Sequence, residues 1–194
     1  MSLRVDIMTA PSSMRVAILG TTFALITGMG GVAPQAQAIQ LADGTVYFAQ
    51  PPRLVAATTT FSGVNMWGAT YYFTLRVPQK AGEPLQKVTI TQHEGGDDIR
   101  FDLEDSRAFE GERHRKGARL TLKEVVRDRK TQTVSVTFDP PVPPGKIVTI
   151  GLRPVENPMY SGVYLFAVTA FPRGEKSHGQ FSGFGRLHFY NNTN

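Results

Sequence analysis

The 194-residue sequence contains no cysteine. Disulfide bonds, thiolate metal sites, a cysteine nucleophile and a lipidated N-terminal cysteine are therefore all excluded. Histidine is also scarce, and the four histidines lie in different segments: His93, His114, His178 and His188. No His-x-His or His-x-x-x-His spacing brings two of them together locally, so we expect no metal site and no cofactor.

Other local signatures of catalysis are missing as well. The Gly-x-Ser-x-Gly pattern does not occur, and we interpret Tyr160-Ser161-Gly162 and Phe181-Ser182-Gly183 as turns. The acidic residues between Glu94 and Asp105 lack the spacing of a calcium-binding loop. We therefore predict no catalytic residues. An aromatic stacking platform is one alternative, although aromatic residues at strand spacing are more often core: Trp67, Tyr71, Tyr72, Tyr160 and Tyr164.

The composition indicates an ordered globular protein. Hydrophobic residues make up 41% and charged residues 19% of the sequence, and the length suits one domain better than two. No segment shows a convincing helical period, whereas short alternating segments recur between turns rich in glycine and proline. The sequence therefore predicts an all-β protein.

Residues 1–38 have the features of a signal peptide. Arg15 precedes an apolar run, and Ala36-Gln37-Ala38 has the small-x-small pattern of a cleavage site. Met14 is an alternative start, and an uncleaved membrane anchor is the alternative interpretation, because the apolar run is nearly long enough to span a membrane. Cleavage after Ala38 leaves residues 39–194 as a single domain with no transmembrane segment.

About nine short strands are expected in this domain. The clearest is 70–77, in which Tyr71, Phe73, Leu75 and Val77 share one face. Others include 99–103 and 119–125. The regular spacing predicts an antiparallel β-sandwich of immunoglobulin-like architecture, with a partly closed β-barrel as the alternative.

The stretch from Pro140 to Pro172 shows this architecture most directly. Proline and glycine mark its loops and separate a strand at 147–154 from a second strand at 162–172. Both faces of the second strand are apolar between Val163 and Phe171, so it lies in the core or carries a docking face. We expect it to lie in the core.

The basic residues concentrate in one segment. Between Glu104 and Lys130, nine basic residues accompany six acidic ones. One interpretation is a solvated pair of strands, and the other is a patch that binds anionic lipid headgroups, an acidic polysaccharide or an acidic protein. Nucleic acid is not expected for an exported chain without a base-reading motif. The candidate binding residues are Arg113, Arg115, Lys116 and Arg119.

Several motifs resemble one known family. They are Phe48–Leu54 (FAQPPRL), Gly68–Phe73 (GATYYF), Ala81–Leu85 (AGEPL), Pro143–Lys146 (PPGK), Asn157-Pro158 and Gly162–Phe166 (GVYLF). In this order they resemble the exported cyanobacterial family of domains of unknown function numbered 2808, over nearly all of the chain after residue 38. The resemblance implies a β-rich domain of the cyanobacterial envelope or thylakoid lumen, and it implies no catalytic residue. With the signal peptide, the expected location is the periplasm, the thylakoid lumen or outside the cell.

Two hypotheses of function follow. The first is a non-enzymatic binding or structural module of the cell envelope or lumen, whose partner is an envelope or lumenal protein, an anionic polysaccharide or lipid headgroups. The second is a hydrolase or metal-dependent enzyme that uses dispersed residues such as His93, Asp97, Asp98 and His178. The second requires these side chains to lie within about 4–6 Å of one another in a pocket.

Overall fold

The structure is a computed structural model that describes residues 39–191. The predicted signal peptide, the alternative start at Met14 and the cleavage site after Ala38 lie outside the described residues. Within residues 39–191, no helix has the length and apolar character needed to cross a membrane.

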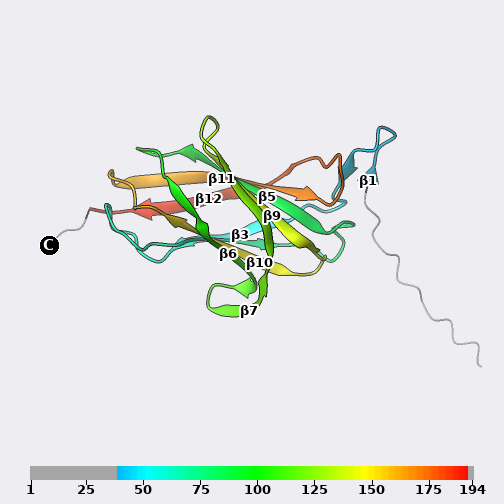
Figure 1. Cartoon of the computed structure of the whole chain (residues 1–194), viewed down its shortest axis with the longest axis horizontal. Coiled ribbons are helices and arrows are strands. Elements are labelled where there is room, and N and C mark those ends of the chain that lie inside the picture. Colours follow the sequence, from blue (N-terminus) through cyan, green and yellow to red (C-terminus); the bar gives the residue numbers. More distant parts are fainter. Residues whose placement is uncertain (1–38, 192–194) are drawn as a thin grey trace, which may run out of the picture. The chain divides into compact units, whose positions relative to one another are not determined.

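Strands dominate the described chain (Figure 1). Twelve are present in residues 39–191: β1 (Ile39–Gln40), β2 (Val46–Tyr47), β3 (Arg53–Thr59), β4 (Tyr71–Arg76), β5 (Leu85–Glu94), β6 (Phe101–Glu112), β7 (Arg115–Leu120), β8 (Leu122–Asp128), β9 (Thr133–Val142), β10 (Ile147–Pro154), β11 (Gly162–Pro172) and β12 (Gln180–Phe189).

Ten of these strands form two five-stranded antiparallel sheets. The first sheet has the order β3-β4-β10-β6-β7, and the second has the order β12-β11-β5-β9-β8. In each sheet two pairs of sequential strands flank a central strand, β10 in the first and β5 in the second. The prediction of an antiparallel β-sandwich of immunoglobulin-like architecture is confirmed. The barrel alternative is wrong, because the strands form two separate sheets rather than one closed sheet.

The core lies between the two sheets. Tyr71, Phe73, Leu75 and Val77 point into it as predicted, and each is at most 1% exposed. From the opposite sheet, β11 contributes its even-numbered side chains, with Phe166 in ring contact with both Tyr71 and Phe73. The outward side chains of β11 are half-buried or exposed, so the expected core position holds for one face of this strand.

Three local expectations are corrected. The predicted strand 99–103 overlaps only the first three residues of the much longer β6, and 119–125 is divided at Thr121 between β7 and β8, which belong to different sheets. Phe181-Ser182-Gly183 lies within β12 rather than in a turn. In each case a long-range strand pairing, which local sequence does not encode, decides the outcome.

Candidate functional site

The candidate site begins with an irregularity in β6. Arg107 pairs with Gly151 of β10, and Asp102 pairs with Arg153. Between these pairs β10 advances by two residues while β6 advances by five. The additional residues of β6 form a large bulge, which displaces this part of the strand from the regular ladder.

The bulge lies opposite the point where the chain passes from one sheet to the other. Thr121 alone separates the end of β7 from the start of β8. Between these segments lies a groove of about 630 Å³, lined by Leu103, Glu104, Ser106 and Arg107 and by every residue from Arg119 to Val125. Successive side chains of a strand point to opposite faces of its sheet. When every residue from Arg119 to Val125 lines the groove, the groove must therefore follow the backbone edge of this segment. The groove therefore runs along the open edge of the sandwich.

The groove combines an apolar floor with a charged rim. Leu103, Leu120, Leu122 and Val125 are half-buried and pack against the core. The rim carries the basic side chains of Arg107, Arg119 and Lys123 and the acidic side chains of Glu104 and Glu124. Such a surface suits a ligand that has both apolar and charged groups.

A second hollow, of about 330 Å³, adjoins the groove. The two share Glu104, Ser106, Arg107 and Arg119, and the second adds Phe109 and Lys116 among its lining residues. Arg107 donates a hydrogen bond to the Oγ1 atom of Thr70 at 3.3 Å, which holds its guanidinium beside both hollows. The hydroxyl of Ser106 is buried and makes no hydrogen bond within the described residues.

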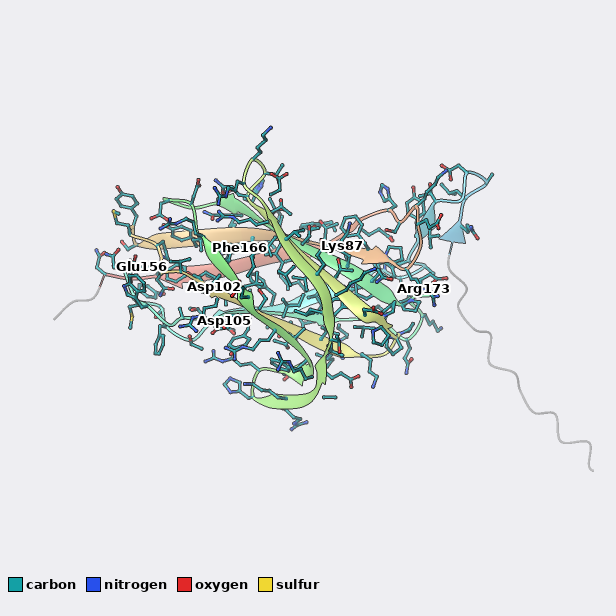
Figure 2. All side chains as sticks on the ribbon, in the orientation of Figure 1. Lys87, Asp102, Asp105, Glu156, Phe166 and Arg173 are labelled. Carbon is teal, nitrogen blue, oxygen red and sulfur yellow. The ribbon has the colours of Figure 1, made fainter. Side chains whose placement is uncertain are left out.

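The charge distribution across this edge is uneven. β6 contains five acidic residues and one basic residue, whereas residues 113–130 contain eight basic and two acidic residues, a formal charge of +6. Within residues 39–191 the ion pairs are Asp105–Arg153 and Glu110–Lys146, the second at 3.0 Å. Figure 2 marks Asp105 on β6, the strand that supplies the carboxylate of both pairs. The cations of these two pairs are Lys146, directly before β10, and Arg153, within β10. None of the eight basic side chains in residues 113–130 therefore forms an ion pair with a carboxylate of residues 39–191.

The four predicted binding residues have different environments. Arg119 lines both hollows and Lys116 lines the second, with its ammonium group 5.4 Å from the ring centroid of Phe109. Arg115 is exposed and lines neither hollow. The structure thus brings two of the four candidates into one groove.

The fourth candidate, Arg113, holds the β6–β7 hairpin against its own sheet. Its guanidinium lies 5.3 Å from the ring centroid of Tyr72 and donates to the carbonyl oxygen of Thr59 at 3.1 Å. Thr149 donates its hydroxyl to the carbonyl oxygen of Gly111 at 2.6 Å. These contacts fold the hairpin tip over the outer face of the first sheet, so Arg113 has a structural role there.

Sequence reasoning missed Arg107 and the apolar floor of the groove as site residues. The floor residues alternate with charged neighbours, as in any half-buried strand. One signal in the sequence could have indicated the site. The net charge changes from negative in β6 to positive in residues 113–130, and such a change marks a boundary between two surfaces.

The structure does not bring the alternative set of dispersed catalytic residues together, because His178 lies apart from Asp97 and Asp98. Asp97 accepts a hydrogen bond from the backbone of Met159 before β11, and Asp98 accepts one from Gln132. His178 packs on Tyr47 beyond the other end of β11, and its backbone donates to Val46. Figure 2 shows these two ends of the sandwich through Glu156 and Arg173, which precede and follow β11. No group of three or more histidine and carboxylate side chains in residues 39–191 could hold a metal ion.

The alternative aromatic platform does not form as one surface. Tyr71 and Tyr164 belong to the core, and Tyr72 is buried on the outer face of the first sheet. Burial raises the pKa of the Tyr71 hydroxyl above its usual range, and burial also raises the pKa of Tyr164. Trp67 and Tyr160 are exposed on two loops.

Together, the fold and the groove define a β-sandwich that presents a basic, partly apolar edge. The chain belongs to the family described as protein of unknown function (DUF2808), whose family model matches residues 45–189. No curated protein matches the chain in sequence.

Several solved structures resemble the chain in their overall arrangement. The collagen-binding domain of a Staphylococcus aureus adhesin is 10% identical, with a TM-score of 0.37, over 71% of this chain and 98% of that one. The C-terminal domain of the antigen I/II-family protein AspA of Streptococcus pyogenes is 12% identical, with a TM-score of 0.37, over 69% and 46%. That of BspA of Streptococcus agalactiae is 16% identical, with a TM-score of 0.39, over 66% and 44%. The chain thus spans less than half of each streptococcal structure, and no residue role is transferred from these likenesses.

Proposed function

We propose that this protein is an exported, non-enzymatic binding module of the cyanobacterial cell envelope or thylakoid lumen. Its ligand is an acidic segment of an envelope or lumenal protein, which binds in the groove between β6, β7 and β8. The observation behind the proposal is the formal charge of +6 in residues 113–130, where no basic side chain forms an ion pair with another residue of the described range 39–191. Three of these cations, Lys116, Arg119 and Lys123, line the groove or the adjoining hollow, where unpaired cations attract and orient an anionic partner.

The apolar floor favours a protein ligand over the two other anionic candidates. Half-buried leucine and valine side chains complement apolar side chains of a peptide, whereas a polysaccharide offers mostly hydroxyl and carboxylate groups. A lipid headgroup would engage the rim and leave the floor uncovered. The free backbone edge along Leu122 to Val125 also provides hydrogen-bonding groups of the kind that an extended peptide uses.

Export is the second part of the proposal, and its support is the sequence of residues 1–38. The N-terminal residue of the protein isolated from cells tests it by mass spectrometry. We expect Ile39, and a mature protein that retains residues 1–38 would contradict export by a cleaved signal peptide.

The binding experiment uses a fluorescein-labelled peptide of alternating glutamate and leucine. Fluorescence anisotropy at low and physiological salt should show binding that weakens with salt, since exposed charges are screened. Arg119→Glu should weaken binding by about tenfold, because it converts an attraction near the groove into a repulsion. Arg173→Glu is the matched control, since Arg173 is exposed, makes no ion pair and lies outside the groove.

Two further probes separate the alternatives. Alginate represents an acidic polysaccharide, and vesicles containing phosphatidylglycerol represent anionic headgroups. Binding of either probe in preference to the peptide would reassign the ligand, and equal effects of Arg119→Glu and Arg173→Glu would contradict the groove as the site.

A further inference from the structure

A second surface lies at the end of the sandwich where β11 begins. The loop between β3 and β4 and the loop between β10 and β11 are joined by two backbone hydrogen bonds. The amide of Asn65 donates to Pro158 at 3.1 Å, and the amide of Asn157 donates to Met66 at 2.9 Å. A third segment, the turn after β5, joins them where Asp97 accepts from the amide of Met159 at 2.9 Å.

The buried side chain of Asn157 holds the two loops together through hydrogen bonds. The residue is 3% exposed, and its Nδ2 donates to the carbonyl oxygens of Phe61 at 3.1 Å and Gly63 at 2.8 Å. Its Oδ1 accepts a hydrogen bond from the Tyr71 hydroxyl at 2.9 Å, which ties the loops to the core. The loops are therefore held by buried hydrogen bonds and form a preorganised surface.

This fixed surface exposes large apolar side chains. Trp67 is 70% exposed, Met159 61% and Tyr160 57%. Trp67 follows Met66 directly, and Tyr160 lies against the turn at Gly96, where an added Cβ atom would be 3.1 Å from the Cβ atom of Tyr160. Side chains of this kind, exposed on loops that the fold keeps rigid, are typical of a binding surface.

The loops that carry these aromatic residues also carry polar side chains, since Trp67 lies two residues after Asn65 and Tyr160 directly follows Met159. A hollow of about 130 Å³ is lined by Asn65, Arg100, Glu156 and Met159, among other residues. The side chains of Asn65, Arg100 and Glu156 make no hydrogen bond or ion pair within residues 39–191. An amide, a guanidinium and a carboxylate can thus donate and accept hydrogen bonds at the end of the sandwich that also exposes the aromatic rings.

From this combination we infer that the loop end binds a neutral saccharide. A pyranose ring has an apolar face that stacks on an aromatic ring, and its hydroxyl groups exchange hydrogen bonds with amide, guanidinium and carboxylate groups. Three carboxylates, those of Asp97, Asp98 and Glu156, accompany the single cation Arg100 around the hollow. This excess of negative charge disfavours the anionic ligand proposed for the groove and an anionic membrane surface alike. The two surfaces therefore take ligands of different chemistry.

The intrinsic fluorescence of Trp67 can report binding at this surface, because Trp67 is the only tryptophan in the sequence. Cellohexaose, mannohexaose and chitohexaose are titrated into the purified protein while the tryptophan emission is recorded. We expect at least one of them to change the emission with saturation on the order of 0.1–1 mM, because the hollow holds little more than one ring. Tyr160→Ala should weaken this binding by about tenfold. It leaves the backbone carbonyl that accepts from the Tyr164 hydroxyl in place.

Matched controls keep the result interpretable. Phe184→Ala removes an aromatic side chain of similar exposure from β12 and should leave saccharide binding unchanged. Absence of any saturable change with all three saccharides up to about 10 mM overturns the inference, because a site of this strength would be saturated there. A response to phosphatidylcholine vesicles without a response to the saccharides overturns it in favour of membrane docking. The glutamate–leucine peptide serves as the independent assay of the groove, so failure of one site does not imply failure of the other.

Discussion

The two side edges of the sandwich are built in opposite ways. At the edge formed by β3 and β12 the sheets meet closely, because β12 presents Gly183 and Gly185 to Leu54 and Ala57. Hydrogen bonds join this edge at both ends, with Gln180 bonded to the backbone of Phe48 and Tyr190 bonded to the β3–β4 loop. At the other edge, the bulge in β6 and the passage from β7 to β8 leave a groove.

This difference indicates that the closed edge contributes to stability and the open edge to recognition. At the closed edge, glycine permits close contact between sheets, so a Cβ atom added at Gly185 must displace Ala57 or the ring of Phe73. At the open edge, most of the exposed side chains are charged, and such charges on an edge strand discourage pairing with other copies of the chain. Substitutions at the closed edge should therefore affect folding, whereas substitutions at the open edge should affect binding.

The largest expected effect comes from Gly185→Ala at the closed edge. The added Cβ atom would lie 2.8 Å from the Cβ atom of Ala57 and 3.1 Å from the ring of Phe73. Both neighbours belong to packed strands, so the methyl group can be accommodated only by moving β3 or the Phe73 ring. We expect the free energy of unfolding to fall by about 1–3 kcal/mol, measured by urea denaturation.

Ala118→Val at the open edge is the control for this substitution. Ala118 is exposed on β7, and the larger side chain has space and suits a strand. The free energy of unfolding should change by less than about 0.5 kcal/mol. If the two substitutions destabilised the protein equally, the distinction between a closed and an open edge would not hold.

An intermediate effect is expected where the open edge is anchored. Arg113→Ala removes the hydrogen bond to Thr59 and the contact with the Tyr72 ring, so the free energy of unfolding should fall by about 1–2 kcal/mol. Arg115→Ala removes an equal charge two residues away, where the side chain is exposed and unpaired. Urea denaturation of the two variants should show a loss for Arg113 alone, and a comparable loss for Arg115 would contradict the structural assignment of Arg113.

The sequence predicted the closed half of the molecule better than the open half. Tyr71, Phe73 and Leu75 alternate with polar residues because β4 has one face in the core, and a period of two is visible locally. In β6 the alternation is confined to its first residues, and β7 is exposed up to Leu120, because the hairpin lies at an edge and its tip folds over the outer face of the sheet.

The groove itself depends on a property that local sequence does not contain. Its walls exist because Arg107 and Asp102 pair with residues of β10 that are only two positions apart, and such a register is set by contacts distant in sequence. Basic residues could be recognised as binding candidates from their number, but their roles could not. Arg113 and Arg119 look equivalent in the sequence, and only the position of Tyr72 under one of them distinguishes the structural residue from the exposed one.

The smallest expected effect concerns Asp128, at the turn that ends β8 on the open edge. The backbone amide of Lys130 donates to its carboxylate at 2.8 Å, and this bond, with a further contribution from Thr131, holds the pKa of Asp128 below its usual value. A carboxyl group whose pKa is lower in the folded state stabilises the protein above the unfolded pKa, which is about 3.9. That contribution is lost as the pH falls through the folded pKa.

Asp128→Asn should therefore reduce the free energy of unfolding slightly at pH 7 and leave it nearly unchanged near pH 2, where both side chains are neutral. The asparagine keeps an oxygen that accepts from the Lys130 amide, so the difference between the two pH values isolates the charge. The effect at pH 7 should be smaller than that of Arg113→Ala, because the Asp128 carboxylate is fully exposed to solvent screening. Urea denaturation of both proteins at the two pH values measures it. A difference that grows toward low pH would mean that the carboxylate destabilises this turn, and the open edge would then owe its structure to Arg113 and not to its exposed charges.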